Sequence, residues 1–174
     1  MNFFCGYKKV ADLKYLNMEE VMEWRDISTG VETIDEHNMR LVSMTKKLVA
    51  AIKEQSCKHI IGDIIRFLED YGVNHSVAEE VYMLYCGYPK YLSHKRQHNQ
   101  FIDDVANLKK DYLNPAPGIE CASYELSVEA NRLMTDWALE HIAVEDKELG
   151  VFINEPCSGC TKIQHAEHLQ HKPS

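Results

Sequence analysis

The stretch YLSHKRQHNQFIDDVANLKKDY, residues 91–112, decides the fold class of this chain. Its inward positions recur at alternating spacings of three and four, the period of an α-helix that buries one stripe. These positions are Tyr91, His94, His98, Phe101, Val105, Leu108 and Tyr112. Two of them are histidines where a helix core would ordinarily carry leucine. The stretch predicts an amphipathic helix with paired imidazoles on its buried face.

Three other stretches repeat this period, and none of them alternates with the period of two that a half-buried strand shows. One contains Ile34, His37, Leu41, Met44, Leu48 and Ile52. The next contains Ile61, Ile64, Leu68, Tyr71, His75, Glu79 and Tyr82, and the last contains Leu126, Ala130, Leu133, Trp137, His141 and Val144. Gly87 and Pro89 end the second helix, and Pro115 follows the third. Such a pattern predicts an all-α fold, an up-down-up-down antiparallel four-helix bundle.

Length and charge limit the classes of protein to which the chain can belong. Its 174 residues favour one domain, with residues 1–23 as an N-terminal extension, 24–153 as the bundle and 154–174 as a polar tail. A net charge of -8 argues against nucleic-acid binding, and no apolar run approaches the roughly 20 residues that span a bilayer. The N-terminus lacks an export signal. We therefore expect a cytoplasmic protein, away from membranes, whose cysteines stay reduced.

Two pairs of polar residues share the buried stripes. His75 and Glu79 are four residues apart on the second helix, and His94 and His98 are four apart on the third. Four residues of an α-helix advance about 400° and 6 Å, so both members of a pair face the same way, one turn apart. Pairs on adjacent helices can therefore converge inside the bundle.

A third pair lies on the fourth helix. His141 and Asp146 are five residues apart, which on an α-helix turns the carboxylate about 140° further round. Buried imidazoles and carboxylates cost several kcal/mol unless a partner compensates them, and a metal is the simplest partner. Four imidazoles and two carboxylates, with His37 as a possible fifth imidazole, exceed the four ligands of a structural zinc site. Two metal ions are implied, and this mixed ligation suits iron or manganese.

These segments resemble a known family. HSVAE (75–79), HKRQH (94–98) and HIAVED (141–146) resemble the HxxxE, HxxxH and HxxxxD motifs of hemerythrins and bacterial hemerythrin domains. The resemblance covers roughly residues 24–153, and Trp24 with Thr29-Gly30-Val31 is similar to the family's N-terminal signature. It implies a non-haem centre of two iron ions, oxo- or hydroxo-bridged, that binds dioxygen.

The resemblance also implies roles for individual residues. The expected metal ligands are His37, His75, Glu79, His94, His98, His141 and Asp146. By the resemblance, the imidazoles at 94, 98 and 141 bind one iron, that at 75 binds the other, and the two carboxylates bridge the pair. Trp137, Ala138 and Ile142 are expected to line the pocket for dioxygen. The family commonly has a bulky aliphatic residue at the position of Ala138, so a wider and wetter pocket is implied.

The first helix departs from the family pattern. Hemerythrins usually read Ile-Asp-x-x-His, with leucine three residues later, whereas this chain reads Ile34-Asp35-Glu36-His37-Asn38 and then Leu41. Aligned without a gap, Asn38 takes the ligand position and His37 lies one residue early. His37 fits the buried stripe, so a small rotation or a π-bulge would still present it to the metal. Without that imidazole, the second iron is more open to water and more labile.

Three kinds of function remain open. The first is reversible binding of dioxygen, for carriage, storage or sensing. The second is an enzyme, a di-iron peroxidase or a scavenger of nitric oxide, which an under-ligated iron favours. The third is a redox- or oxygen-sensing signalling module with a protein partner at the extension or tail. The tail holds Cys157-x-x-Cys160 followed by His165, His168 and His171, which suit a metal or a redox pair, although a flexible tail is the default.

Overall fold

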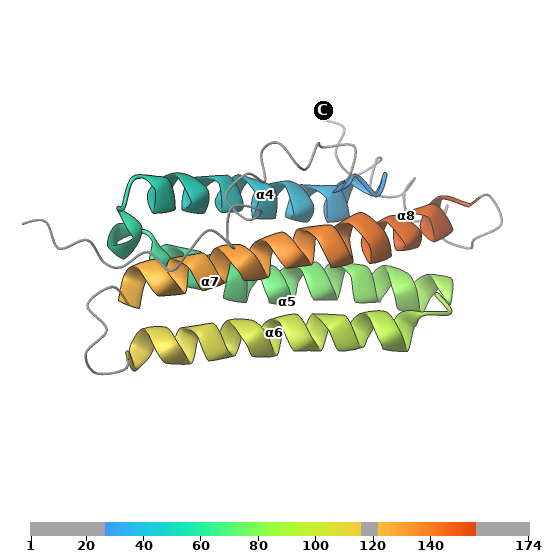
Figure 1. Cartoon of the computed structure of the whole chain (residues 1–174). Coiled ribbons are helices and arrows are strands. Elements are labelled where there is room, and N and C mark those ends of the chain that lie inside the picture. Colours follow the sequence, from blue (N-terminus) through green and yellow to red (C-terminus); the bar gives the residue numbers. More distant parts are fainter. Residues whose placement is uncertain (1–26, 116–121, 156–174) are drawn as a thin grey trace, which may run out of the picture.

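A computed structural model describes residues 27–115 and 122–155, and every regular element within these ranges is a helix. The α-helices are α4 (Glu32–Lys53), α5 (Ile61–Cys86), α6 (Tyr91–Leu113), α7 (Ala122–Asp136) and α8 (Lys147–Asn154). A short 3-10 helix, η1 (Cys57–His59), precedes α5, and a π-helix, η2 (Trp137–Asp146), joins α7 directly to α8. Figure 1 shows α7, η2 and α8 as one rod alongside α4, α5 and α6. The predicted all-α helical bundle is confirmed for the described residues.

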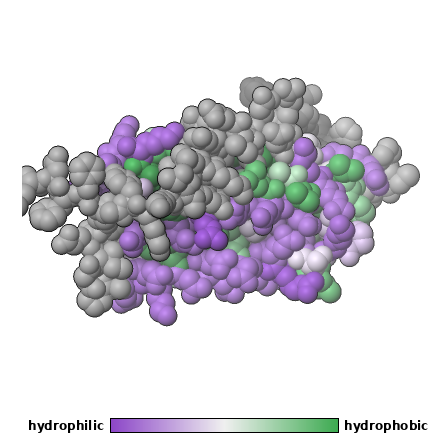
Figure 2. Space-filling view, in the orientation of Figure 1, coloured by the Kyte–Doolittle hydropathy of each residue, from purple (hydrophilic) through white to green (hydrophobic). Residues whose placement is uncertain are grey.

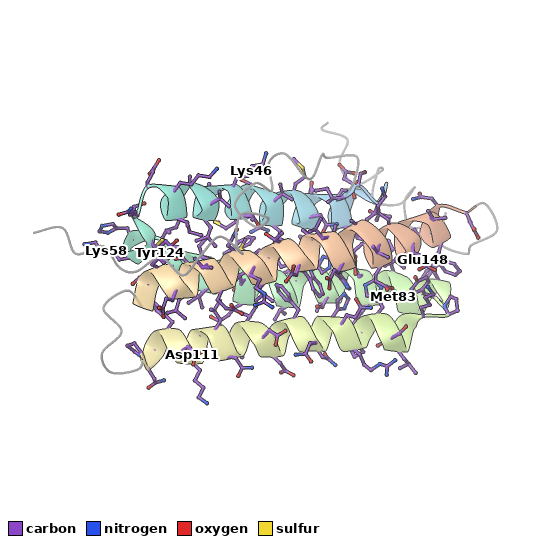
Figure 3. All side chains as sticks on the ribbon, in the orientation of Figure 1. Lys46, Lys58, Met83, Asp111, Tyr124 and Glu148 are labelled. Atoms are coloured by element: carbon purple, nitrogen blue, oxygen red, sulfur yellow. The ribbon has the colours of Figure 1, made fainter. Side chains whose placement is uncertain are left out.

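The sequence signals for the helix ends hold at α5. This helix ends at Cys86, and Gly87 follows it in the left-handed conformation with φ +66°, which glycine adopts without strain. The Tyr88 amide then donates to the Met83 carbonyl at 2.8 Å. Figure 3 labels Met83 and Glu148 near this end of the bundle. The predicted extension at 1–23 and the tail beyond residue 155 lie outside the described residues.

Two apolar clusters pack at different levels of the bundle, and the polar residues lie between them. The larger cluster consists of Ile27, Leu41, Leu48, Ile52, Cys57, Ile61, Ile64, Ile65, Leu68, Tyr71, Phe101, Val105, Leu108, Ala130, Met134, Trp137, Ala138 and Ile142. The smaller cluster consists of Val31, Ile34, Tyr82, Met83, Tyr88, Leu149 and Ile153. On α5, Tyr71 belongs to the larger cluster and Met83 to the smaller one, with His75 and Glu79 between them. On α4, buried Asn38 lies between the two clusters in the same way. The apolar packing on both sides therefore holds a narrow polar layer in the interior.

A turn before α4 ties the first helix to the last. The Asp35 carboxylate accepts hydrogen bonds from the Thr29 amide at 2.6 Å, the Thr29 hydroxyl at 2.7 Å and the Ser28 hydroxyl at 2.8 Å. The side-chain amide of Asn154 in α8 donates to the Thr29 carbonyl at 3.3 Å. Because the turn contacts α8 and leads directly into α4, it sets how α4 approaches the rest of the bundle.

Gly150 lets this turn sit against α8, and we expect Gly150→Ala to destabilise the fold. A Cβ at this position would lie 2.3 Å from the Thr29 carbonyl oxygen, a backbone atom that cannot turn away. Glycine-to-alanine changes inside a helix ordinarily stabilise it, whereas overpacking here should cost about 1–3 kcal/mol. Urea denaturation measures the free energy of unfolding, with Val151→Ala, at a neighbouring exposed position, as the control. A Gly150→Ala variant as stable as the wild type would contradict this packing.

The visible surface over α6 is predominantly hydrophilic in Figure 2. Among the described helices, none combines the length and the apolar character that crossing a membrane requires.

Among the described cysteines, Cys57 in η1 is buried and free. The expectation that the other cysteines stay reduced remains a prediction. Spacing along the chain does not reveal which cysteines meet in space.

Candidate metal centre

Six of the seven expected metal ligands meet in the polar layer. They are His75 and Glu79 of α5, His94 and His98 of α6, and His141 and Asp146 of η2, each at most 2% exposed. Their ligand atoms form two overlapping groups, in each of which all atoms lie within 4.8 Å of one another. One group is His75, Glu79, His98 and His141, and the other is Glu79, His94, His141 and Asp146. The shared residues, Glu79 and His141, make the two groups one cluster.

Glu79 stands at the centre of this cluster. Its Oε2 atom lies 2.8 Å from Nε2 of His94, 3.1 Å from Nε2 of His98, 3.6 Å from Nε2 of His75 and 4.0 Å from Nε2 of His141. One carboxylate oxygen that faces four imidazole nitrogens is in position to bind a metal ion in either of the two ligand groups. The four-residue spacing on α5 and α6 produces this convergence, as the sequence predicts.

The π-helix η2 explains the five-residue spacing of His141 and Asp146. On an α-helix the carboxylate would lie about 140° further round than the imidazole, an offset expected to suit an aspartate that reaches under a metal from the end of the helix. In a π-helix each hydrogen bond runs from residue i to i+5, so the fifth residue returns to the same face. Both side chains are accordingly buried, with His141 Nε2 3.0 Å from Asp146 Oδ1. The expected offset of the two side chains is wrong because the local helix is not an α-helix.

The unpartnered atoms of the cluster fit cations. Buried polar atoms almost always have a hydrogen-bond partner, yet Nε2 of His75 and His141, Oε1 of Glu79 and Oδ1 of Asp146 have none. Two of these atoms are informative, because His141 Nε2 and Asp146 Oδ1 are 3.0 Å apart and yet do not have the geometry of a hydrogen bond. Two donors at about 2.1 Å from one metal ion are separated by about 3 Å. The arrangement is that of atoms directed at a common third point.

Electrostatics prepares most of the imidazoles for a metal. Complete burial lowers the pKa of His75 to about 3, and burial likewise lowers the pKa of His98 to about 4 against the opposing pull of Glu79. Both are therefore neutral near pH 7, with lone pairs to donate. Burial also lowers the pKa of His94, but the carboxylates of Asp146 and Glu79 outweigh it and raise that pKa to about 9. In the absence of a metal ion, protonated His94 thus supplies the positive charge beside these carboxylates that a bound cation would otherwise supply.

Two neighbours orient His141. Its Nδ1 donates to Oε1 of Gln97 at 2.8 Å, which leaves the lone pair on Nε2, the atom that faces the cluster. The Trp137 ring stacks on the imidazole with centroids 3.7 Å apart and planes 17° apart. Gln97 was missed as a functional residue in the sequence, although it lies between the two imidazoles of HKRQH and so on the face toward the fourth helix.

The first helix places Asn38 at the cluster. Asn38 is fully buried, and its Nδ2 donates to Asp146 Oδ2 at 3.3 Å. His37 is only partly buried, belongs to neither ligand group, and has its ring centroid 6.4 Å from that of His75. The helix α4 is α-helical from Glu32 to Lys53, so the π geometry that was considered for this helix occurs in η2 instead.

The expected pocket residues lie together in the larger apolar cluster. Ala138 and Ile142 are fully buried, and Trp137 is 9% exposed. Trp137 Nε1 donates to the Tyr71 hydroxyl at 3.2 Å. The sequence predicts Tyr71 only as a buried residue of its helix. Its position one turn before His75 is the signal that indicates a place beside the metal cluster. A groove of about 510 Å³ between α6 and the α7–η2 rod has Trp137 and His141 in its wall.

Comparisons with known proteins agree with this geometry. The family model described as "Hemerythrin HHE cation binding domain" matches residues 29–153. A bacteriohemerythrin of Stenotrophomonas maltophilia is 27% identical over 128 residues, which cover 73% of this chain and 78% of the relative. Bacteriohemerythrins of Pseudomonas aeruginosa and Methylococcus capsulatus are 30% and 28% identical, covering 71% and 75% of this chain and 75% and 95% of the relatives. No solved structure matches significantly. With its helical bundle and buried imidazole–carboxylate cluster, the chain belongs to the hemerythrin family.

Proposed function

We propose that this chain holds two iron ions in the buried cluster and binds dioxygen reversibly there, as a non-enzymatic oxygen-binding protein. The observation that carries the proposal is the pair of overlapping four-residue ligand groups, which share Glu79 and His141. Six buried ligands exceed the four of a structural zinc site, and their division into two overlapping groups suits two ions. In the proposed partition, three imidazoles hold one iron, His75 holds the other, and Glu79 and Asp146 lie between them.

The surroundings of the cluster suit such a function. When bound, a ferrous pair supplies the two electrons that reversible binding of dioxygen draws on. The chain contributes the neutral imidazoles, whose protonation burial suppresses at His75 and His98. Trp137, Ala138 and Ile142 provide an apolar wall, and the groove beside His141 offers a small molecule a way in.

Metal analysis combined with visible spectroscopy tests this proposal. We expect anaerobically loaded protein to contain two ferrous ions per chain and to develop a visible absorption band in air. The band should disappear when dioxygen is removed. Zinc-loaded protein serves as the control, because zinc has no redox chemistry. One metal ion per chain with a featureless spectrum would remove the proposal.

An enzymatic function is the second candidate, a di-iron peroxidase or a scavenger of nitric oxide. Asn38 favours it, because an amide beside the cluster in place of an imidazole leaves one metal with more exchangeable coordination. Steady-state turnover of peroxide or nitric oxide with a reductant would distinguish an enzyme from a carrier.

The remaining parts of the proposal concern the whole chain. We include an up-down-up-down antiparallel order of the four rods, with residues 24–153 as the bundle. We also propose that the chain binds no nucleic acid. If the chain acts as a sensor, we propose that a protein partner binds at residues 1–23 or 154–174. A cytoplasmic location belongs to the proposal too, and cell fractionation tests it.

A further inference from the structure

Four buried side chains form a chain of hydrogen bonds at the edge of the metal cluster. The indole Nε1 of Trp137 donates to the Tyr71 hydroxyl at 3.2 Å, and that hydroxyl donates to Oδ1 of Asn38 at 3.5 Å. Nδ2 of Asn38 then donates to Asp146 Oδ2 at 3.3 Å. The Tyr71 ring stacks on the His75 ring, with centroids 5.1 Å apart and planes 14° apart. The phenol and the amide therefore sit together beside His75.

The hydroxyl hydrogen of Tyr71 is poorly engaged in this chain. Trp137 already donates to the hydroxyl oxygen, so the hydroxyl must direct its own hydrogen elsewhere. Its acceptor, Asn38 Oδ1, lies at 3.5 Å, well beyond the usual 2.7–2.8 Å of a hydroxyl-to-oxygen hydrogen bond. A better acceptor nearby would therefore take this hydrogen.

Because position 38 of α4 holds asparagine, the ligand atom that this helix can give to a metal beside His75 is an amide oxygen. An imidazole nitrogen is a strong ligand for iron, whereas an amide supplies only a carbonyl oxygen, which suits harder and more weakly held ions. The amide nitrogen of Asn38 donates a hydrogen bond to Asp146. The metal position beside His75 thus has a weak or exchangeable ligand from α4, whereas the other metal position is surrounded by three imidazoles.

From this juxtaposition, and resting on the proposed function, we infer that Asn38 and Tyr71 form a binding corner for a small anion. The metal ion beside His75 is held more weakly than its neighbour. The vacated coordination position takes water or a small anion, to which the Tyr71 hydroxyl donates a hydrogen bond. Tyr71 is thereby a specificity-determining residue, because it favours ligands with a strong acceptor atom over neutral ligands without one.

A metal titration tests the role of Asn38. Metal-free protein titrated with cobalt(II) should bind two ions in separate steps, the second about a hundredfold weaker than the first. Asn38→His should strengthen the second step by about tenfold or more and leave the first unchanged. Asn74→His, which adds an imidazole at an exposed position of α5, is the matched control. An unchanged second step in Asn38→His would overturn the inference.

An anion titration tests the role of Tyr71. In the diferric protein, Tyr71→Phe should weaken azide binding by roughly fivefold to tenfold, the value of one hydrogen bond. Tyr85→Phe removes a hydroxyl from a 58%-exposed position on the same helix and should change nothing. Equal azide affinities for Tyr71→Phe and wild type, at equal iron content, would overturn the inference. Should Tyr71→Phe fail to fold, azide binding by Asn38→His decides instead: an imidazole in the vacated position should weaken azide binding, and an affinity equal to the wild type would overturn the inference.

The two levels of proposal fail in different ways. Wild-type protein that never takes up two iron ions, or never binds dioxygen, contradicts the proposed function. Wild-type protein that does both, while Asn38→His and Tyr71→Phe behave like wild type, contradicts only the anion-binding corner.

Discussion

Glu79→Gln should weaken iron binding by at least about a hundredfold and leave at most one ion per chain. The substitution keeps the shape of the side chain and removes its negative charge. Glu79 belongs to both ligand groups, and its Oε2 lies within 4.0 Å of four imidazole nitrogens. Even partners one step removed from a metal are worth ten- to a hundredfold in affinity. A residue between two cations should be worth at least as much.

Metal content after dialysis against a weak chelator measures this loss directly. Glu69→Gln is the matched control, because Glu69 lies on the same helix and pairs with Lys109 at 2.7 Å on the surface. The control should retain the wild-type content. Circular dichroism should show that both variants remain helical, since a neutral amide removes a buried charge rather than adding one. Two tightly held iron ions in Glu79→Gln would place the metal centre elsewhere.

The helices and most of the ligands were predictable because one periodicity governs both. A residue four positions along an α-helix returns to the same face, so His75 with Glu79, and His94 with His98, had to share the buried side. Their burial followed from the apolar residues in the same stripes. The structure brings them together as expected, with Glu79 between the imidazoles.

Other features depend on geometry that residue types do not reveal. Nothing in WALEHIAVED distinguishes a π-helix from an α-helix, so the shared face of His141 and Asp146 emerged only from the structure. The hydrogen bonds of Gln97 and Tyr71 join different helices and depend on side-chain directions. The sequence left both His37 and Asn38 as candidates for the first-helix position, and only the structure places Asn38 at the cluster.

Acid should unfold the metal-free protein at a higher pH than the metal-loaded protein. His75 and His98 are held neutral in the fold, with pKa values of about 3 and about 4, whereas both are near 6.5 in the unfolded chain. Between these values the unfolded state binds more protons, so the free energy of unfolding falls as the pH falls. His94 adds no slope in this range, because it is protonated in both states below pH 6.5. Its own contribution is lost on the alkaline side, as the pH rises through about 9.

The size of the acid effect is set by the two lowered values. Two histidines kept neutral from pH 6.5 down to pH 4 cost about 6 kcal/mol in total, which is comparable with the whole stability of an ordinary domain. Bound cations raise the free energy of unfolding by mass action and hold the same nitrogens unprotonated, so the loaded protein should resist acid further.

Urea denaturation of metal-free protein at several pH values measures this slope. His75→Gln removes one of the two titrating groups and should reduce the slope between pH 4 and 6.5 by about half. His59→Gln is the control, because His59 is exposed in η1 and its loss should leave the slope as it was. A free energy of unfolding that stays level across this range in the wild type would mean that the imidazoles already take up protons in the fold. The neutral, cation-ready cluster would then not exist near pH 5.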